Sequence, residues 1–375
     1  MKEKKDKLKI KTITCHDVYN FGASLQAYAL MRYLTELGHD VEIIDYKPPY
    51  LTFNIWAIGP RWNKNPLLRL LYFMYVVPKR LSHRNARVKF DKFTSSNLNL
   101  TKQTYRSTTE LQQSPLVADV FFAGSDQIWN PLLPNGKDPS FFLKFVNDKS
   151  IKASYAASFS VKDIPSELKS HYKDMLSNID FISVRESSGL KILKDLSVDE
   201  AQVVVDPVFL INQREWKRIT HKDYEEKYIF VYDQENNKMI RDVAKHLSKR
   251  YNLKIYAVES LYPMKYAHKR IKNADPIDFI SLINSAEIIL TNSFHCISFS
   301  IIFNKKFWLF KRTHMKVNLR MVDLLNSLDL SDRIYRGDMK SLNINEINYA
   351  NVLTKLKPLI NTSYSYIDTV LKNQK

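Results

Sequence analysis

Residues 9–46 read KIKTITCHDVYNFGASLQAYALMRYLTELGHDVEIIDY, and this stretch decides the fold. Lys9–Thr14 is rich in isoleucine and threonine and predicts a strand. The chain then turns at Phe21 into a helix, which Gly38 ends, and Val41–Tyr46 predicts a second strand. The apolar face of the predicted helix comprises Ala27, Leu30, Met31, Leu34 and Leu37. The stretch is therefore one βαβ unit, which favours a parallel sheet.

The same alternation of strands and helices continues along the chain. Further strands are predicted at Asp119–Ala123, Lys152–Ala157, Phe181–Val184 and Gln202–Val205. Each of these strands is followed by a polar cluster, respectively Gly124-Ser125-Asp126, Ser158, Arg185-Glu186 and Asp206-Pro207. Ligands in open α/β sheets bind beyond the carboxyl ends of the strands, so these clusters are candidate site edges.

A second α/β series follows a break near residues 212–226. Its predicted strands are Tyr228–Tyr232, Leu253–Val258, Glu287–Leu290 and Phe307–Phe310. We therefore predict an N-terminal domain over residues 1–214 and a C-terminal domain over residues 215–345. A helix within residues 346–375 is expected to pack back across the first domain.

Composition limits the possible functions. The 375-residue chain carries a formal charge of +18, which predicts an anionic partner such as a phosphorylated substrate, an acidic membrane surface or nucleic acid. No nucleic-acid-binding motif is found, so nucleic acid is not an expected partner. Cys15 and Cys296 have no paired spacing, which indicates neither a disulfide framework nor a zinc site. Neither a signal peptide nor a membrane-spanning run is recognised, and we expect a cytoplasmic protein.

Residues 46–90 form an unusual basic and aromatic insertion. The stretch contains no Asp or Glu, but it holds nine Lys and Arg residues interleaved with Trp56, Trp62 and the apolar run Leu70–Val77. This pattern fits peripheral contact with anionic lipid at the inner face of a membrane. It equally fits an inserted helix whose apolar face joins the core while its cations remain solvated.

Asn292-Ser293-Phe294-His295 lies between a predicted strand and the helix Phe294–Phe303. An imidazole in the first turn of a helix is close to unsatisfied N–H groups and to the positive end of the helix dipole, so His295 is suited to bind an anion or transfer a proton. Ser293 is expected to cap this helix. A histidine that only satisfies local polar groups is the simpler alternative.

Arg185 directly follows a predicted strand, where a guanidinium can grip a carboxylate or phosphate. The alternative is an ion pair with Glu186 or Asp206. The stretch from Gly124 to Asn130 reads GSDQIWN and can supply backbone and side-chain groups to a sugar, although simple turn chemistry also explains it.

Cys15-His16-Asp17 is the one stretch that looks like a nucleophile cluster. Neighbouring residues of a strand point to opposite faces, so proximity in sequence does not make these three side chains a relay. Cys15 is interpreted as a small buried residue.

Taken together and in order, five motifs resemble the polysaccharide pyruvyl transferase family. They are NFGASLQA at 20–27, GSDQIWN at 124–130, SVRE at 183–186, VDP at 205–207 and SFH at 293–295. The resemblance implies two Rossmann-like domains with mainly parallel sheets facing across a cleft, as in GT-B glycosyltransferases. It implies a transferase that moves pyruvyl from phosphoenolpyruvate to a lipid-linked or nucleotide-linked sugar and forms a pyruvate ketal in polysaccharide biosynthesis.

The resemblance also implies roles for individual residues. His295 matches the family's proposed general acid and Arg185 an arginine thought to hold the donor, while Lys316 is the nearest match to a family lysine, with Lys311 and Arg312 competing. Substrate binding is expected of Asn20, Gly22, Gly124, Ser125, Asp126, Gln127, Asn292 and Ser293. No cofactor or metal is expected, because cations can carry the charge.

One departure from the family pattern bears on phosphate binding. The family histidine usually follows Arg-Leu, whereas here it follows Ser293-Phe294. If that arginine binds phosphate, another cation has to replace it in this chain. Two other functions stay open: a glycosyltransferase of similar architecture that uses a nucleotide sugar, and a non-catalytic saccharide- or membrane-binding relative.

Overall fold

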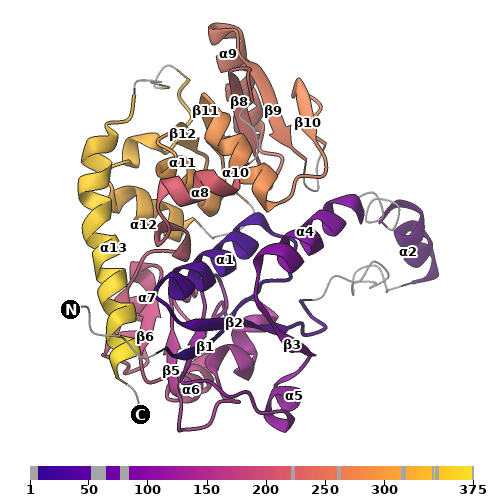
Figure 1. Cartoon of the computed structure of the whole chain (residues 1–375). Coiled ribbons are helices and arrows are strands. Elements are labelled where there is room, and N and C mark those ends of the chain that lie inside the picture. The colour runs from indigo at the N-terminus through magenta and orange to yellow at the C-terminus, as the bar shows by residue number, and fades with distance from the viewer. Residues whose placement is uncertain are drawn as a thin grey trace.

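Two parallel sheets of five strands each build the molecule (Figure 1). The computed structural model describes residues 7–51, 65–76, 84–220, 224–259, 263–313, 318–339, 342 and 346–373. In spatial order the N-terminal sheet comprises β3 (Leu100–Tyr105), β2 (Asp40–Tyr46), β1 (Lys9–Ile13), β4 (Val120–Ala123) and β5 (Ile151–Ser154). The C-terminal sheet comprises β10 (Lys269–Ile271), β9 (Lys254–Val258), β8 (Tyr228–Tyr232), β11 (Ile288–Thr291) and β12 (Lys306–Leu309). A short pair, β6 (Ile182–Val184) and β7 (Ala201–Val203), completes the strands of the described residues.

Helices cover these sheets, as expected when parallel strands are connected by crossovers. Those of the N-terminal half are α1 (Phe21–Glu36), α2 (Pro66–Leu71) with its continuation η1 (Tyr72–Val76), α4 (Arg84–Asn97), α5 (Thr108–Gln113), α6 (Ser166–Leu176) and α7 (Ser187–Asp195). The remainder are α8 (Gln213–Ile219), α9 (Lys238–Tyr251), α10 (Pro276–Ser285), α11 (Phe294–Ile302), α12 (Leu319–Ser327) and α13 (Tyr349–Lys372). No helix among the described residues is both long and apolar enough to cross a bilayer.

The predicted strands agree with the observed ones within a few residues, and the predicted fold class is confirmed by the two parallel sheets. Two edge strands, β3 and β10, were not predicted. Leu100–Tyr105 reads LTKQTY, in which four of the six residues are polar, while Lys269–Ile271 has only three residues with one apolar side chain. Edge strands of this kind lack the continuous apolar run that marks a buried parallel strand.

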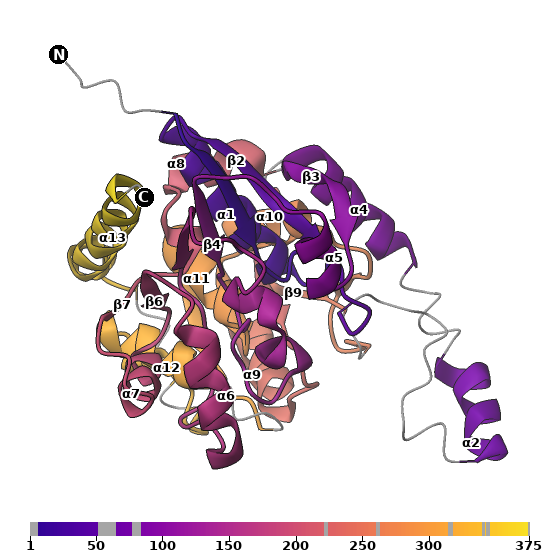
Figure 2. The same cartoon turned by 90° about the horizontal axis from the view of Figure 1, so that it is seen from below.

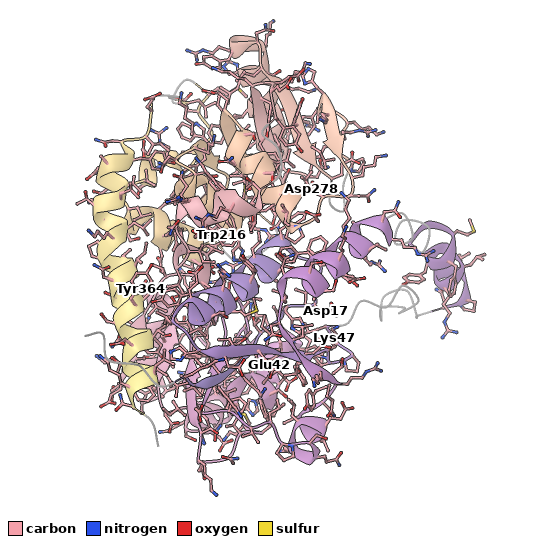
Figure 3. The ribbon with its side chains drawn as sticks, in the orientation of Figure 1. Asp17, Glu42, Lys47, Trp216, Asp278 and Tyr364 are labelled. Atoms are coloured by element: carbon pink, nitrogen blue, oxygen red, sulfur yellow. The ribbon has the colours of Figure 1, made fainter. Side chains whose placement is uncertain are left out.

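Helix α1 connects β1 and β2 of the N-terminal sheet, and it also packs on helices of the second half of the chain. Its first residue, Phe21, stacks on Phe279 of α10 with ring centroids 4.6 Å apart. Trp216 of α8 is fully buried, and its ring lies near Tyr28 of α1 and Phe299 of α11 (Figure 3). The predicted boundary at residues 214/215 therefore falls inside a helix that both halves share, and the division into domains stays a prediction.

The last helix, α13, runs along both halves of the molecule (Figure 1). Near its end, Tyr366 donates a hydrogen bond to the carbonyl of Ser154 at the end of β5, at 2.7 Å. Near its start, Tyr349 donates to the carbonyl of Lys305, just before β12, at 2.5 Å. One helix thus links the outer strands of the two sheets.

Candidate functional site

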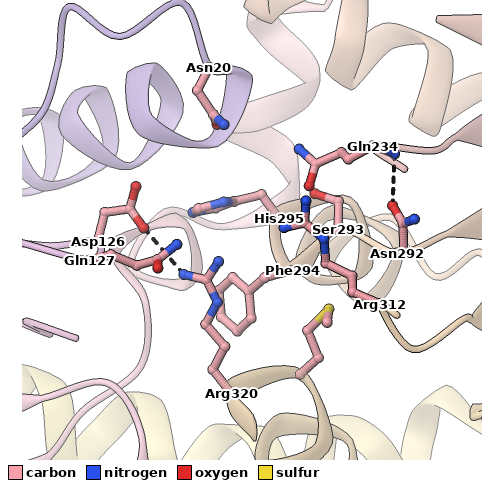
Figure 4. Close-up of a pocket in the computed structure, with 11 residues that line it drawn as sticks. Asn20, Asp126, Gln127, Gln234, Asn292, Ser293, Phe294, His295, Arg312 and Arg320 are labelled. Atoms are coloured by element: carbon pink, nitrogen blue, oxygen red, sulfur yellow. Dashed lines mark hydrogen bonds and ion pairs between the residues drawn. The ribbon is translucent and has the colours of Figure 1, made fainter. Parts of the chain in front are cut away.

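A polar cavity of about 170 Å³ lies where the two halves meet (Figure 4). The amino ends of two helices converge on it, since Asn20 precedes α1 and His295 belongs to the first turn of α11. The lining residues are Asn20, Asp126, Gln127, Gln234, Asn292, Ser293, Phe294, His295, Arg312, Arg320 and Met321. Helix amino ends attract anions, so the position itself favours a negatively charged ligand.

Helix α1 begins at this cavity because Asn20 caps it. The Asn20 side chain accepts hydrogen bonds from the backbone N–H groups of Gly22 and Ala23, at 2.9 and 3.3 Å. Gly22 then passes directly under the imidazole of His295, and a Cβ added there would lie 1.9 Å from Nδ1. Only glycine leaves room for this contact, which brings together two motifs from the two ends of the chain.

His295 enters the site from α11, on a loop that is tightly fixed. Asn292 donates to Asp233 Oδ1 at 2.7 Å and accepts from the backbone N–H of Gln234 at 3.0 Å. Ser293 occupies the capping position, but its side chain forms no capping hydrogen bond, so the prediction of a serine cap is wrong. The side chain therefore leaves the N–H groups in the first turn of α11 open to a ligand.

Five charged groups form an alternating chain beneath and beside the cavity, and we call them the interdomain network. In order they are Arg320, Asp126, Arg185, Asp206 and His295. Arg320 Nη1 and Arg185 Nη2 lie 3.3 and 3.2 Å from Asp126 Oδ1. Arg185 Nη1 and His295 Nε2 lie 2.6 and 3.4 Å from Asp206 Oδ2. With His295 protonated, the three cations exceed the two carboxylates by one charge.

Burial and charge together set the protonation of this network. Burial alone would raise the pKa of Asp206, but His295 and Arg185 hold that pKa well below its usual range. Asp126 shows the same balance, because Arg185 and Arg320 outweigh its burial and lower its pKa. Burial and the neighbouring Arg185 lower the pKa of Arg320 to about 10. Both carboxylates and the Arg320 guanidinium are therefore charged at neutral pH.

Several polar atoms of the network are buried without a hydrogen bond. They are Nε of Arg185 and Nε of Arg320, while Nε2 of His295 has only its ion pair with Asp206 at 3.4 Å. The side chains of His295 and Arg320 are only 8% and 10% exposed. Buried donors left without a partner are unfavourable and uncommon in folded proteins. The arrangement is consistent with a site whose missing acceptors belong to a ligand.

The ring of Phe294 supports both arginines of the network. The guanidinium carbons of Arg185 and Arg320 lie 4.8 and 5.4 Å from its centroid. Stacking on an aromatic face suits guanidinium groups and restricts their motion. Phe294, which stands where the family usually has leucine, thus positions the cations, as the view of Arg320 beside it shows (Figure 4).

The predicted substrate-binding residues divide into two groups. Asn20, Asp126, Gln127, Asn292 and Ser293 line the cavity, as the catalytic candidate His295 does. The other three do not, and Gly22 lies against the imidazole of His295. Gly124 and Ser125 lie behind the cavity: a Cβ on Gly124 would meet the carbonyl oxygen of Tyr155 at 2.1 Å, and Ser125 Oγ donates to the carbonyl of Ala156 at 2.8 Å. These two residues shape the turn that presents Asp126.

The cations that were predicted to be catalytic also lie in different places relative to the cavity. Arg185 does not line the cavity, and the alternative ion pair with Asp206 is what its side chain forms. Lys316 lies outside the described residues. Of its two competitors, Lys311 is exposed, whereas Arg312 lines the cavity with Nε 3.3 Å from Oε1 of Glu235.

Arg320 is the lining cation that the sequence analysis missed. Its guanidinium carbon lies 5.4 Å from the ring centroid of Phe294, the residue before His295, so it is a cation available at this point of the cavity. A signal was available, because Arg320 is the second residue of α12, where a cation is unfavourable beside the positive end of the dipole. Within the described parts of the chain, no three His, Cys, Asp or Glu side chains gather as metal ligands would.

Comparisons with known proteins agree with this reading of the motifs. The sequence profile of the polysaccharide pyruvyl transferase family matches residues 20–314, which confirms the resemblance. No curated protein sequence matches the chain.

Solved structures supply a likeness of fold. A protein from Listeria monocytogenes described as a UDP-N-acetylglucosamine 2-epimerase superposes with a TM-score of 0.52 at 8% identity, covering 98% of this chain and 91% of that one. A glycosyltransferase from Rickettsia africae gives 0.47 at 14% identity, covering 98% and 100%. At such low identity the likeness shows only the fold, and the first match supports the two-domain, GT-B-like arrangement.

Proposed function

Because the chain belongs to the polysaccharide pyruvyl transferase family, we propose that its interdomain cavity binds phosphoenolpyruvate and transfers the pyruvyl group to a saccharide. The observation that carries the proposal is the polar cavity at the converging amino ends of α1 and α11, which His295, Arg312 and Arg320 line and beside which Nε of Arg320 is left without a partner. Phosphoenolpyruvate is a small molecule with two anionic groups, and such a site can hold both its carboxylate and its phosphate.

The proposed reaction starts with a proton from His295. Protonation of C3 turns the methylene into a methyl group and makes C2 electrophilic, and Asp206 keeps the imidazole in position from its Nε2 side. One sugar hydroxyl adds to C2, and the C2–O bond to phosphate breaks. A second hydroxyl then attacks C2 and closes the ketal. One of the two hydroxyl protons returns to His295, and the other leaves with the phosphate.

The cations stabilise the negative charge that moves to the leaving phosphate. Arg320 and Arg312 both line the cavity and are the groups suited to stabilise that charge. Arg185 does not contact the substrate in this proposal. It holds Asp126 and Asp206 in place, and these two carboxylates in turn position Arg320 and His295. Arg185 is therefore a positioning residue in this proposal, and no metal or cofactor takes part.

The acceptor in this proposal is a lipid-linked or nucleotide-linked sugar used in polysaccharide assembly. Both cysteines are free, which fits the reducing cytoplasm where we place the reaction. The test is incubation of the full chain with phosphoenolpyruvate and a panel of such sugars. We expect phosphate release together with an acceptor that gains the mass of a pyruvate ketal. No release across the panel, with binding of a nucleotide sugar instead, would contradict the proposal and favour a glycosyltransferase.

A further inference from the structure

A helix outside the body of the molecule exposes a row of large apolar side chains. It consists of α2 and its continuation η1, and the two views show it projecting beyond α4 (Figures 1 and 2). Leu67, Leu70, Phe73 and Met74 are 65%, 55%, 43% and 52% exposed, and we call them the apolar arm surface. Their spacing of i, i+3, i+6 and i+7 places them on one side of a helix.

Such a cluster is unusual for a side of the molecule that faces only water. Single exposed apolar residues are normal, but a contiguous group marks a surface that binds something. The described residues include other exposed apolar side chains, such as Val117 and Leu132, and these lie far from each other in sequence. The apolar arm surface gathers four of them within eight residues.

The charge around the apolar arm surface indicates the chemistry of its partner. No Asp or Glu occurs from residue 46 to residue 90, although the stretch carries nine Lys and Arg residues. Arg69 lies on the same helix and Arg84 begins α4, and both are exposed. Apolar side chains bordered by cations, without any carboxylate, match the interface of a bilayer that contains anionic lipid.

The arm is rooted beside the interdomain cavity. Phe90 of α4 stacks on Phe21 at 5.2 Å, and Phe21 immediately follows Asn20, which lines the cavity. Lys89 of the same helix forms an ion pair with Asp278 of the second half at 3.0 Å. From the start of α4 to Phe90 the helix rises only about 9 Å. Helix α4, beyond which α2 projects, thus reaches residues that lie next to the site.

We propose that the apolar arm surface docks the protein on a membrane containing anionic lipid. The four side chains enter the interfacial layer while the surrounding cations contact lipid headgroups. A second part of the inference rests on the proposed function: docking brings the enzyme to the membrane that holds a lipid-linked acceptor.

Vesicle flotation of the full chain tests the docking. The vesicles are phosphatidylcholine alone, or phosphatidylcholine with an equal amount of phosphatidylglycerol. We expect the wild type to bind the mixed vesicles and to bind pure phosphatidylcholine much more weakly. Leu70→Ser with Phe73→Ser should weaken binding to the mixed vesicles at least about tenfold. Arg69→Gln with Arg84→Gln should weaken it about fivefold for each cation removed.

Matched variants control for general effects of the substitutions. Val117→Ser with Leu132→Ser removes two exposed apolar side chains elsewhere, and Lys245→Gln with Lys249→Gln removes two exposed cations from α9. Both should bind the mixed vesicles as the wild type does. Since all these side chains are exposed, unchanged thermal unfolding midpoints are expected and exclude misfolding as the cause.

Three results would overturn the inference. These are no binding to the mixed vesicles, equal binding by wild type and the Leu70/Phe73 variant, and concentration-dependent self-association that this variant alone abolishes, which would assign the surface to a second copy. The assay contains no substrate, so its outcome is separate from the proposed reaction. If the chain transfers pyruvyl to a nucleotide-linked sugar but does not bind vesicles, the proposed function stands and the docking proposal is wrong.

Discussion

Two groups of charged side chains lie at or beyond the carboxyl ends of strands, and they differ in one respect. In the interdomain network Asp126 follows β4 and Arg185 follows β6, whereas His295 and Arg320 come from helices of the second half of the chain. The second group, which we call the strand-end cluster, lies at the ends of β1 and β2 and consists of His16, Asp17, Asp45 and Lys47, of which Asp17 and Lys47 are labelled in Figure 3. In the strand-end cluster, His16 Nε2 and Lys47 Nζ lie 3.0 and 3.1 Å from Asp45 Oδ1.

Both groups combine an imidazole, carboxylates and a cation, so residue types alone do not distinguish them. The His16 ring has a partner for each nitrogen, since Nδ1 lies 3.3 Å from the carbonyl of Thr14. The hollow beside the strand-end cluster has no space for a water molecule, whereas the interdomain cavity measures about 170 Å³. Open space together with unsatisfied donors marks a ligand site, and complete pairing without space marks a structural one.

Substitutions of the two histidines should show the largest difference between the ligand site and the structural cluster. His295→Gln should lower kcat for pyruvyl transfer about 10³-fold, because it removes the proton donor. His16→Gln should leave kcat within about twofold and lower the free energy of unfolding by about 1 to 3 kcal/mol, through the loss of a buried partner for Asp45. Steady-state phosphate release and urea unfolding measure the two effects. Similar losses of activity in both variants would contradict the distinction.

Removing Arg185 should show that one member of the interdomain network is mainly structural. Arg185→Gln leaves Asp126 and Asp206 without their shared cation and should cost about 3 to 5 kcal/mol of stability. Arg320→Gln, at the edge of the cavity, should cost clearly less stability and weaken phosphoenolpyruvate binding more. Urea unfolding and calorimetry on both variants measure this. Equal stability losses would mean that the two arginines do not have separate roles.

The contact between Gly22 and His295 can be tested with a single methyl group. Gly22→Ala places a Cβ against the imidazole and should lower kcat about 100-fold by displacing it. Gly38→Ala is the control, because its φ of +97° makes alanine strained while nothing lies within 4 Å. That variant should lose about 1 kcal/mol of stability and no activity. Full activity of Gly22→Ala would show that the observed contact is not maintained during the reaction.

The strand-end cluster should make the stability of the protein depend on pH in the acid range. Burial would raise the pKa of Asp45, but hydrogen bonds from His16, Thr104 and Lys47 lower it to about 2. A depressed pKa contributes stability above the unfolded value of 3.8, and this is lost as the pH falls through about 2. The wild type should therefore lose about 2 kcal/mol more than Asp45→Asn between about pH 5 and about pH 2. Parallel urea curves at each pH would contradict the assignment.

Local patterns in the sequence predicted most of the fold. The strands around the cavity are buried on both faces and read as short β-rich runs, and the polar residues that follow them, such as Asp126 and His295, do lie at the cavity. Periodicity and capping residues act over a few positions, so one sequence suffices to recognise them.

The features that the sequence did not predict depend on packing between elements that lie far apart in the chain. The close approach of Gly22 to His295 depends on how α1 and α11 meet, and no local pattern encodes that. The direction of Arg320 depends on the position of α12 relative to β4. Arg185 and Asp206 could be named as partners in advance, but which of the arginines faces the cavity is decided by tertiary structure.

Calorimetric titration with phosphoenolpyruvate tests the central claim most directly, namely that unsatisfied donors between the two halves bind a small dianion. The account predicts saturable binding of one molecule per chain, weakened at least about tenfold by Arg320→Gln, through the loss of a charge-assisted contact, and unchanged by Lys47→Gln. No binding to the wild type, or equal weakening by both substitutions, would contradict it.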